Sequence, residues 1–142
     1  MAYRERFAMP RILILESYGP TRQALAMILE REGWEVTPSQ TDQEAFEALL
    51  HSDYDVLLID LEMNTGDGWR VLQHLMPDRV MPDRKTPIIA ILDQESQRSQ
   101  QAQELGARAI LYKPIRRKRL LDSAAAALNC EDMMPLQGPL LP

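Results

Sequence analysis

Cysteine is nearly missing from this chain, which has one, Cys130, among its 142 residues. A single thiol cannot close an internal disulfide, and no Cys and His residues stand at zinc-ligand spacing. The sequence therefore predicts a fold that is held together by a hydrophobic core. It also indicates a reducing compartment, so the expected location is cytoplasmic.

Long apolar runs and a surplus of basic charge are missing as well. No segment reaches the roughly 20 apolar residues of a membrane-spanning helix, and residues 1–10 lack the apolar stretch of a secretory signal. The 21 acidic residues outnumber the 16 Lys and Arg residues, which gives a formal net charge of −5. Because a general nucleic-acid binder needs a basic surface, we expect no direct contact with nucleic acid, and the lack of a long apolar run predicts no contact with a membrane.

The chain does contain a regular alternation of short apolar runs and helical patterns. Such alternation is typical of βαβ units and a parallel sheet. Strands are predicted at residues 11–15, 34–37, 56–59, 87–92 and 109–112. Helices are predicted to begin near residues 19, 41 and 67 and to span residues 95–105 and 116–128.

The same pattern sets the limits of the folded unit. We expect one domain at residues 11–128, a linker or tail at residues 1–10, and a second tail without periodicity at residues 129–142. The tetrapeptide Met-Pro-Asp-Arg occurs at 76–79 and again at 81–84, and its prolines predict a solvated loop.

Thr41 and Glu44 have the spacing of a capping box, in which each side chain accepts a hydrogen bond from the other residue's backbone N–H. This pair predicts the start of the second helix. That helix is expected to bury four apolar residues, namely Ala45, Phe46, Leu49 and Leu50.

Residues with chemical potential follow three of the predicted strands. Glu16 and Ser17 follow the first strand, Asp60 follows the third, and Lys113 follows the fifth. In an open parallel sheet the functional crevice lies at the carboxyl ends of the strands, so these residues are expected to converge. Carboxylates can hold Mg²⁺, an ammonium can neutralise a phosphoryl group, and an aspartate can itself accept one.

Four segments of the chain resemble the receiver domains of response regulators and hybrid histidine kinases. They are 12–17 (Ile-Leu-Ile-Leu-Glu-Ser), 60–68 (Asp-Leu-Glu-Met-Asn-Thr-Gly-Asp-Gly), 86–90 (Thr-Pro-Ile-Ile-Ala) and 112–115 (Tyr-Lys-Pro-Ile). The order and spacing of the segments carry the resemblance more than any single motif does. The resemblance implies a flavodoxin-like, doubly wound α/β fold with five parallel strands in the order 2-1-3-4-5.

The resemblance also implies roles for the site residues. Asp60 would be the phosphoacceptor, Lys113 would neutralise the phosphoryl group, and Glu16 and Asp60 would hold Mg²⁺. The implied donor is a histidine kinase or a phosphotransfer domain. Another receiver or a second copy of the chain is expected to dock on the face of the fourth helix, fifth strand and fifth helix.

Three positions depart from the family pattern. Ser17 stands in place of a second acidic metal ligand, Leu92 in place of a phosphoryl-binding Thr or Ser, and Ile110 in place of an aromatic switch residue. A hydroxyl is a poor Mg²⁺ ligand, so we expect weak Mg²⁺ binding, with Glu62 as a compensating ligand. Leu92 donates no hydrogen bond and Ile110 is stiff at χ1, so an occupied Asp60 is expected to alter the docking face very little.

Two functions therefore stay open. The chain is either a receiver that accepts a phosphoryl group on Asp60 and signals through a partner, or a phosphorylation-independent pseudo-receiver that binds a partner constitutively. Enzymatic function is not expected, because a haloacid-dehalogenase-like phosphatase has a second Asp where this chain has Glu62. Fold alone does not decide between the two.

Overall fold

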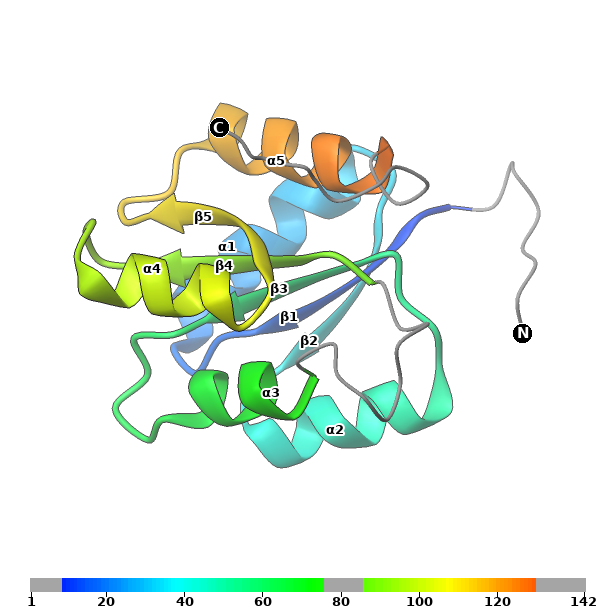
Figure 1. The fold of residues 1–142 in the computed structure, drawn as a ribbon. Coiled ribbons are helices and arrows are strands. Elements are labelled where there is room, and N and C mark those ends of the chain that lie inside the picture. The colour runs from blue at the N-terminus through cyan, green and yellow to red at the C-terminus, as the bar shows by residue number, and fades with distance from the viewer. Residues whose placement is uncertain (1–8, 76–85, 130–142) are drawn as a thin grey trace.

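The computed structural model describes residues 9–75 and 86–129 of the chain (Figure 1). The two expected tails lie almost entirely outside these ranges, and both copies of the Met-Pro-Asp-Arg repeat lie outside them completely. The predictions made for those segments therefore fall outside the described residues.

Strands and helices alternate along the chain. The elements are β1 (Arg11–Leu15), α1 (Gly19–Arg31), β2 (Glu35–Ser39), α2 (Asp42–His51), β3 (Val56–Asp60), α3 (Asp67–Leu75), β4 (Ile88–Leu92), α4 (Gln97–Glu104), β5 (Ala107–Tyr112) and α5 (Arg117–Asn129). The five strands are parallel and lie in the order β2-β1-β3-β4-β5, which confirms the predicted fold class and strand order. Within the described ranges, no helix has both the length and the hydropathy needed to cross a bilayer.

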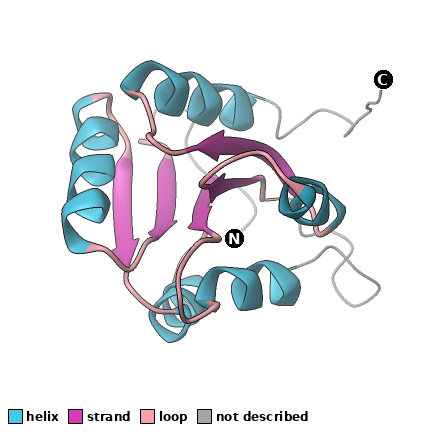
Figure 2. Cartoon of the chain, turned by 90° about the vertical axis from the view of Figure 1, so that its left-hand side faces the viewer, coloured by secondary structure: helices cyan, strands magenta, loops and turns pink. Residues whose placement is uncertain are grey.

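The sheet separates two apolar layers, and Figure 2 shows the helices around it. On one face, Leu29 of α1 and Leu120 of α5 belong to the buried cluster. On the other face, the cluster includes Ala45 of α2, Leu72 of α3 and Ala102 of α4. Because helices cover both faces, β3 and β4 are buried along their whole length, which explains why their sequences are apolar except for Asp60 at the end of β3.

Hydrogen bonds with the edge strand β2 hold the backbone in place where the chain leaves β1. β2 pairs with β1 and includes Pro38, which is exposed. The buried hydroxyl of Ser39 donates to the carbonyl of Ile14 at 2.7 Å. The N–H of Glu16 donates to the carbonyl of Ser39 at 3.1 Å. These two bonds hold the backbone of Glu16 in place beside β2.

Gly68, in the first turn of α3, packs directly against the backbone of Asp60. A Cβ atom at position 68 would lie 2.0 Å from the carbonyl oxygen of Asp60 and 3.3 Å from a methyl group of Ile59. Only glycine permits so close an approach of two backbone segments. Gly68 therefore sets the distance between α3 and the end of β3.

The second helix starts where predicted but differs from the prediction in two details. The Thr41 hydroxyl accepts from the N–H of Glu44 at 3.2 Å, whereas the Glu44 carboxylate accepts from the N–H of Gln40 at 2.7 Å. The predicted burial of Leu50 was wrong, because this side chain is 82% exposed. The other three apolar residues named for this helix pack against the core, so Leu50 lies just outside the buried stripe.

Candidate functional site

The carboxyl ends of β1, β3 and β5 bring three charged residues together. Lys113 Nζ lies 3.2 Å from Asp60 Oδ2, and the Glu16 carboxyl is close enough to Asp60 for the two groups to influence each other's charge. Both carboxyl residues are only 2% exposed, whereas the Lys113 side chain is 34% exposed. The site therefore consists of two buried carboxyls and one ammonium that solvent can reach.

Both oxygens of Asp60 are held by donors. Lys113 binds Oδ2, and the backbone N–H of Glu62 donates to Oδ1 at 2.8 Å. Charge-assisted bonds of this kind are stronger than neutral ones. The two bonds keep the carboxylate in one orientation at the end of β3.

Glu16 is buried against a second acid, and this environment raises its pKa. Burial is the largest cause, the hydrogen bond and negative charge of Asp60 add to it, and the pKa rises from 4.5 to about 7. Glu16 Oε2 accepts from the N–H of Tyr18 at 3.0 Å, but Oε1 is buried and has no donor among the described residues. Two neighbouring buried carboxyls need a proton or a cation between them. The pair therefore fits a divalent cation.

Ser17 adds no carboxylate to this pair. The residue is exposed, and Arg22 Nη1 donates to its carbonyl at 3.1 Å and to the carbonyl of Glu16 at 2.8 Å. In the part of the chain that the structure describes, no three metal-ligating side chains cluster. Mg²⁺ is commonly held by one or two carboxylates together with phosphate oxygens and water. Glu16 and Asp60 fit that pattern and offer few ligands in the absence of a phosphoryl group.

The Glu62 side chain points to the start of α4. Its Oε1 accepts from Arg98 Nη1 at 2.9 Å, and its Oε2 accepts from the backbone N–H of Asp93 at 3.1 Å. The Arg98 guanidinium also lies over the Trp69 ring, 5.5 Å from its centroid. Glu62 is thus engaged with α4 and the loop before it, and its role as a compensating metal ligand stays a prediction.

Asp93 is a second acidic partner of Lys113 that the sequence reasoning missed. Its Oδ1 lies 3.8 Å from Lys113 Nζ. Burial lowers the pKa of Lys113, but the charges of Asp60, Glu16 and Asp93 outweigh it, so the net pKa is raised. Asp93 directly follows β4, and the carboxyl-end rule that singled out Asp60 would have found it.

The two predicted switch positions lie on the same side of the sheet as α4. Leu92 is fully buried and pairs in register with Tyr112, while Ile110 packs against the same apolar cluster as Leu92. The Tyr112 hydroxyl lies 2.9 Å from Ser99 Oγ of α4. An aromatic residue of β5 is therefore attached to α4, two positions after Ile110, and no sequence signal indicated this contact.

Comparison with known proteins places the chain within one domain family. The model of the response regulator receiver domain matches residues 12–125. The sensory/regulatory protein RpfC of Xanthomonas campestris is 28% identical over 126 residues, which cover 88% of this chain and 17% of RpfC. The transcriptional regulatory protein SrrA of Staphylococcus aureus is 29% identical over 83% of this chain and 47% of SrrA. The chain thus spans less than half the length of either relative.

Solved structures show the same fold. A two-component response regulator from Clostridium difficile superimposes with a TM-score of 0.76 at 22% identity, over 87% of this chain and 98% of that one. The chemotaxis response regulator CheY4 of Vibrio cholerae gives a TM-score of 0.74 at 24% identity, over 84% of this chain and 99% of that one.

Proposed function

Because the chain belongs to the response regulator receiver domain family of two-component signalling, we propose that Asp60 is its phosphoacceptor. The observation that carries the proposal is the 3.2 Å contact of Lys113 Nζ with Asp60 Oδ2, beside the buried Glu16 carboxyl. A nucleophilic carboxylate, a neutralising cation and a further metal-binding carboxylate are what phosphoryl acceptance requires. We assign residues 11–128 to this domain.

In the proposed reaction, a carboxylate oxygen of Asp60 attacks the phosphorus of a phosphohistidine on the donor. The new P–O bond forms as the P–N bond breaks, and the electron pair of the broken bond stays on the histidine nitrogen. Lys113 then balances the charge of the phosphoryl oxygens. Glu16 and Asp60 would hold a Mg²⁺ ion, which would supply further neutralisation of those oxygens. Glu62 joins this cation only if its carboxylate leaves Arg98.

The proposed donor is a histidine kinase or a phosphotransfer domain, and the proposed location is the cytoplasm. The family to which the chain belongs supports this class of partner. The net charge of −5 argues against direct binding to nucleic acid, and no contact with a membrane is proposed. We propose no enzymatic turnover for this chain beyond the loss of its own phosphoryl group from Asp60.

The test of phosphoacceptance is labelling with acetyl phosphate and Mg²⁺, followed by intact-mass measurement. We expect one phosphoryl group on the wild-type chain and none on Asp60→Asn. Lys113→Gln keeps the acceptor and removes the neutralising charge, so it should label more slowly. An unlabelled wild-type chain would favour the alternative function, a phosphorylation-independent interaction module. The observation that favours this alternative is Leu92, which is fully buried and has no group to bind a phosphoryl oxygen.

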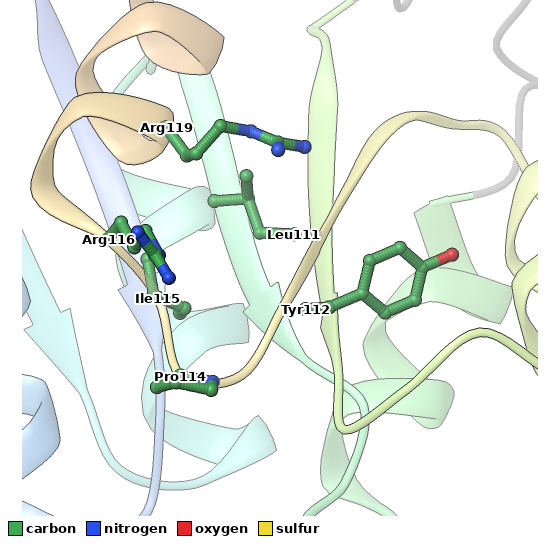
Figure 3. Close-up of a pocket in the computed structure, with 6 residues that line it drawn as sticks. All are labelled: Leu111, Tyr112, Pro114, Ile115, Arg116 and Arg119. Atoms are coloured by element: carbon green, nitrogen blue, oxygen red, sulfur yellow. The ribbon is translucent and has the colours of Figure 1, made fainter.

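We further propose that α4, β5 and α5 form the docking face for another receiver or a second copy of the chain. This face has a pocket at the start of α5, shown in Figure 3, whose lining includes Leu111, Ile115, Arg116 and Arg119. Within residues 9–75 and 86–129, neither arginine has an acidic partner. Two unpaired guanidinium groups beside apolar side chains suit a partner surface that combines carboxylates with apolar residues.

The other two basic residues of the same run supply a matched control. Arg117 pairs with Glu32 at 3.1 Å, and Lys118 pairs with Asp122 at 2.8 Å. Sedimentation velocity over a range of concentrations compares two double variants of equal charge change. We expect Arg116→Glu with Arg119→Glu to abolish association, and Arg117→Glu with Lys118→Glu to preserve it. Equal behaviour of the two double variants would contradict the proposed face.

A further inference from the structure

Glu62 connects the acceptor carboxylate to α4 through two different groups of one residue. Its backbone N–H donates to Asp60 Oδ1 at 2.8 Å, and its carboxylate binds Arg98 Nη1 at 2.9 Å. Arg98 lies in the first turn of α4, which spans Gln97–Glu104. Among the described residues, Glu62 alone makes polar contacts both with Asp60 and with α4. A change of charge at Asp60 therefore takes place beside Glu62, the residue whose carboxylate binds Arg98 of α4.

The carboxylate of this ion pair is better shielded from solvent than the carboxylates of the two surface pairs of α5. The Glu62 side chain is 15% exposed, whereas the acids in the Arg117–Glu32 and Lys118–Asp122 pairs are 47% and 63% exposed. A shielded carboxylate that loses its partner is left with a desolvation penalty, so Glu62 has to exchange one donor for another when it moves.

We propose that Glu62 and Arg98 form a displaceable ion pair that transmits the state of Asp60 to α4. The proposal rests on the phosphoacceptor role of Asp60. A phosphoryl group adds about −1.5 to −2 charges at neutral pH. That charge repels the Glu62 carboxylate and attracts the Arg98 guanidinium, so it has opposite effects on the two members of the pair. Arg98 carries the first turn of α4 with it when the pair rearranges.

This route does not use the two altered switch positions. The expectation that the docking face changes very little rests only on Leu92 and Ile110, neither of which bears a charge. A ligand shifts a conformational equilibrium by its differential interaction with two states, and here the differential interaction is electrostatic. Arg98 thus supplies, from α4, a phosphoryl-seeking group that Leu92 cannot supply from β4.

The structure offers a control contact between α4 and the sheet that carries no charge. The Ser99 hydroxyl lies 2.9 Å from the Tyr112 hydroxyl and also accepts from the N–H of Ser96 at 3.2 Å. Tyr112→Phe removes this attachment without touching Glu62 or Arg98. It reports what happens when α4 is merely loosened.

The test uses beryllium fluoride with Mg²⁺ as a phosphoryl mimic and follows the backbone amide shifts of the full chain. Shifts of the Asp60 and Lys113 amides report occupancy, and shifts of residues 97–104 report the response of α4. We expect both sets to move in the wild type and in Tyr112→Phe. In Arg98→Gln, the occupancy shifts should persist while the α4 shifts are lost.

The possible results distinguish failure of the ion-pair proposal from failure of the phosphoacceptor proposal on which it rests. If the Asp60 and Lys113 amides move in the wild type while α4 does not, the ion-pair route is wrong. It is equally wrong if Arg98→Gln keeps the full α4 response, or if Tyr112→Phe loses the response as completely as Arg98→Gln does. If no shift occurs at Asp60 and Lys113 in any variant, the phosphoacceptor proposal fails, and the ion-pair proposal fails with it.

Discussion

The raised pKa of Glu16 predicts that the protein loses stability as pH rises toward neutrality. In the unfolded chain this carboxyl ionises near its ordinary value of 4.5, whereas in the folded chain it keeps its proton until about pH 7. Between these values the folded state binds the proton and the unfolded state does not. The contribution of Glu16 is therefore fully present below pH 4.5, declines through this window, and is lost above pH 7.

The size of the effect follows from the shift itself. A rise in pKa from 4.5 to about 7 corresponds to on the order of 3 kcal/mol in the free energy of unfolding. Other carboxyls oppose it. For Asp67, burial raises the pKa, but hydrogen bonds from Thr65 and Asp42 and the charge of Arg70 outweigh it, so the pKa is lowered. The dependence of stability on pH is thus the sum of several carboxyl contributions. The difference in stability between the wild type and a variant that lacks the Glu16 carboxyl isolates the contribution of Glu16.

Glu16→Gln provides that difference, because glutamine has nearly the same shape and does not titrate. Urea unfolding of both proteins between pH 4.5 and 8 should show the variant gaining on the wild type as pH rises, by on the order of 3 kcal/mol in total. Mg²⁺ at pH 8 should then stabilise the wild type more than the variant, because the cation favours two ionised carboxyls. Parallel pH profiles for the two proteins would refute the reasoning.

Three smaller predictions concern the metal, the site backbone and a helix cap. Ser17→Asp should tighten Mg²⁺ binding by about tenfold or more, from a millimolar value, in a titration followed by tryptophan fluorescence; submillimolar affinity in the wild type would contradict this. Gly68→Ala should lower the free energy of unfolding in urea by about 1–3 kcal/mol, because its methyl group would meet the carbonyl of Asp60; an unchanged urea midpoint would show that α3 can move away. Thr41→Ala should lower thermal stability by about 1 kcal/mol, because the Glu44 N–H loses its acceptor, and a calorimetric melt that matches the wild type would count against the cap.

The sequence was sufficient for the fold because burial on both faces leaves a simple pattern. β4 and the first four residues of β3 are continuous apolar runs, and each run ends where a polar residue begins. Their order in the sheet came from the family resemblance, and the carboxyl-end rule brought Glu16, Asp60 and Lys113 to one place. These features depend on the hydrophobic pattern and on the order of the strands and helices, both of which can be inferred from the sequence.

The polar contacts around the site could not be predicted in the same way. The Glu62–Arg98 pair joins residues 36 positions apart, and the Ser99–Tyr112 contact joins residues 13 apart. Each such contact is worth about 1 kcal/mol and imposes no periodic pattern on the sequence. They depend on side-chain directions that only the packed helices set. The predicted burial of Leu50 was wrong for a different reason. Leucine is a residue type that suits the buried stripe of α2, but position 50 lies outside that stripe.

The exposed proline in β2 has a consequence for colloidal behaviour. An edge strand with free backbone donors is a template on which a strand of another molecule can pair, and this is a common start of aggregation. Pro38 has no N–H to offer, and Glu35 at the other end of the strand is exposed and charged. Proline is tolerated at an edge because no outer strand needs its missing donor. β2 is thereby blunted as a seed for sheet growth at this edge of the sheet.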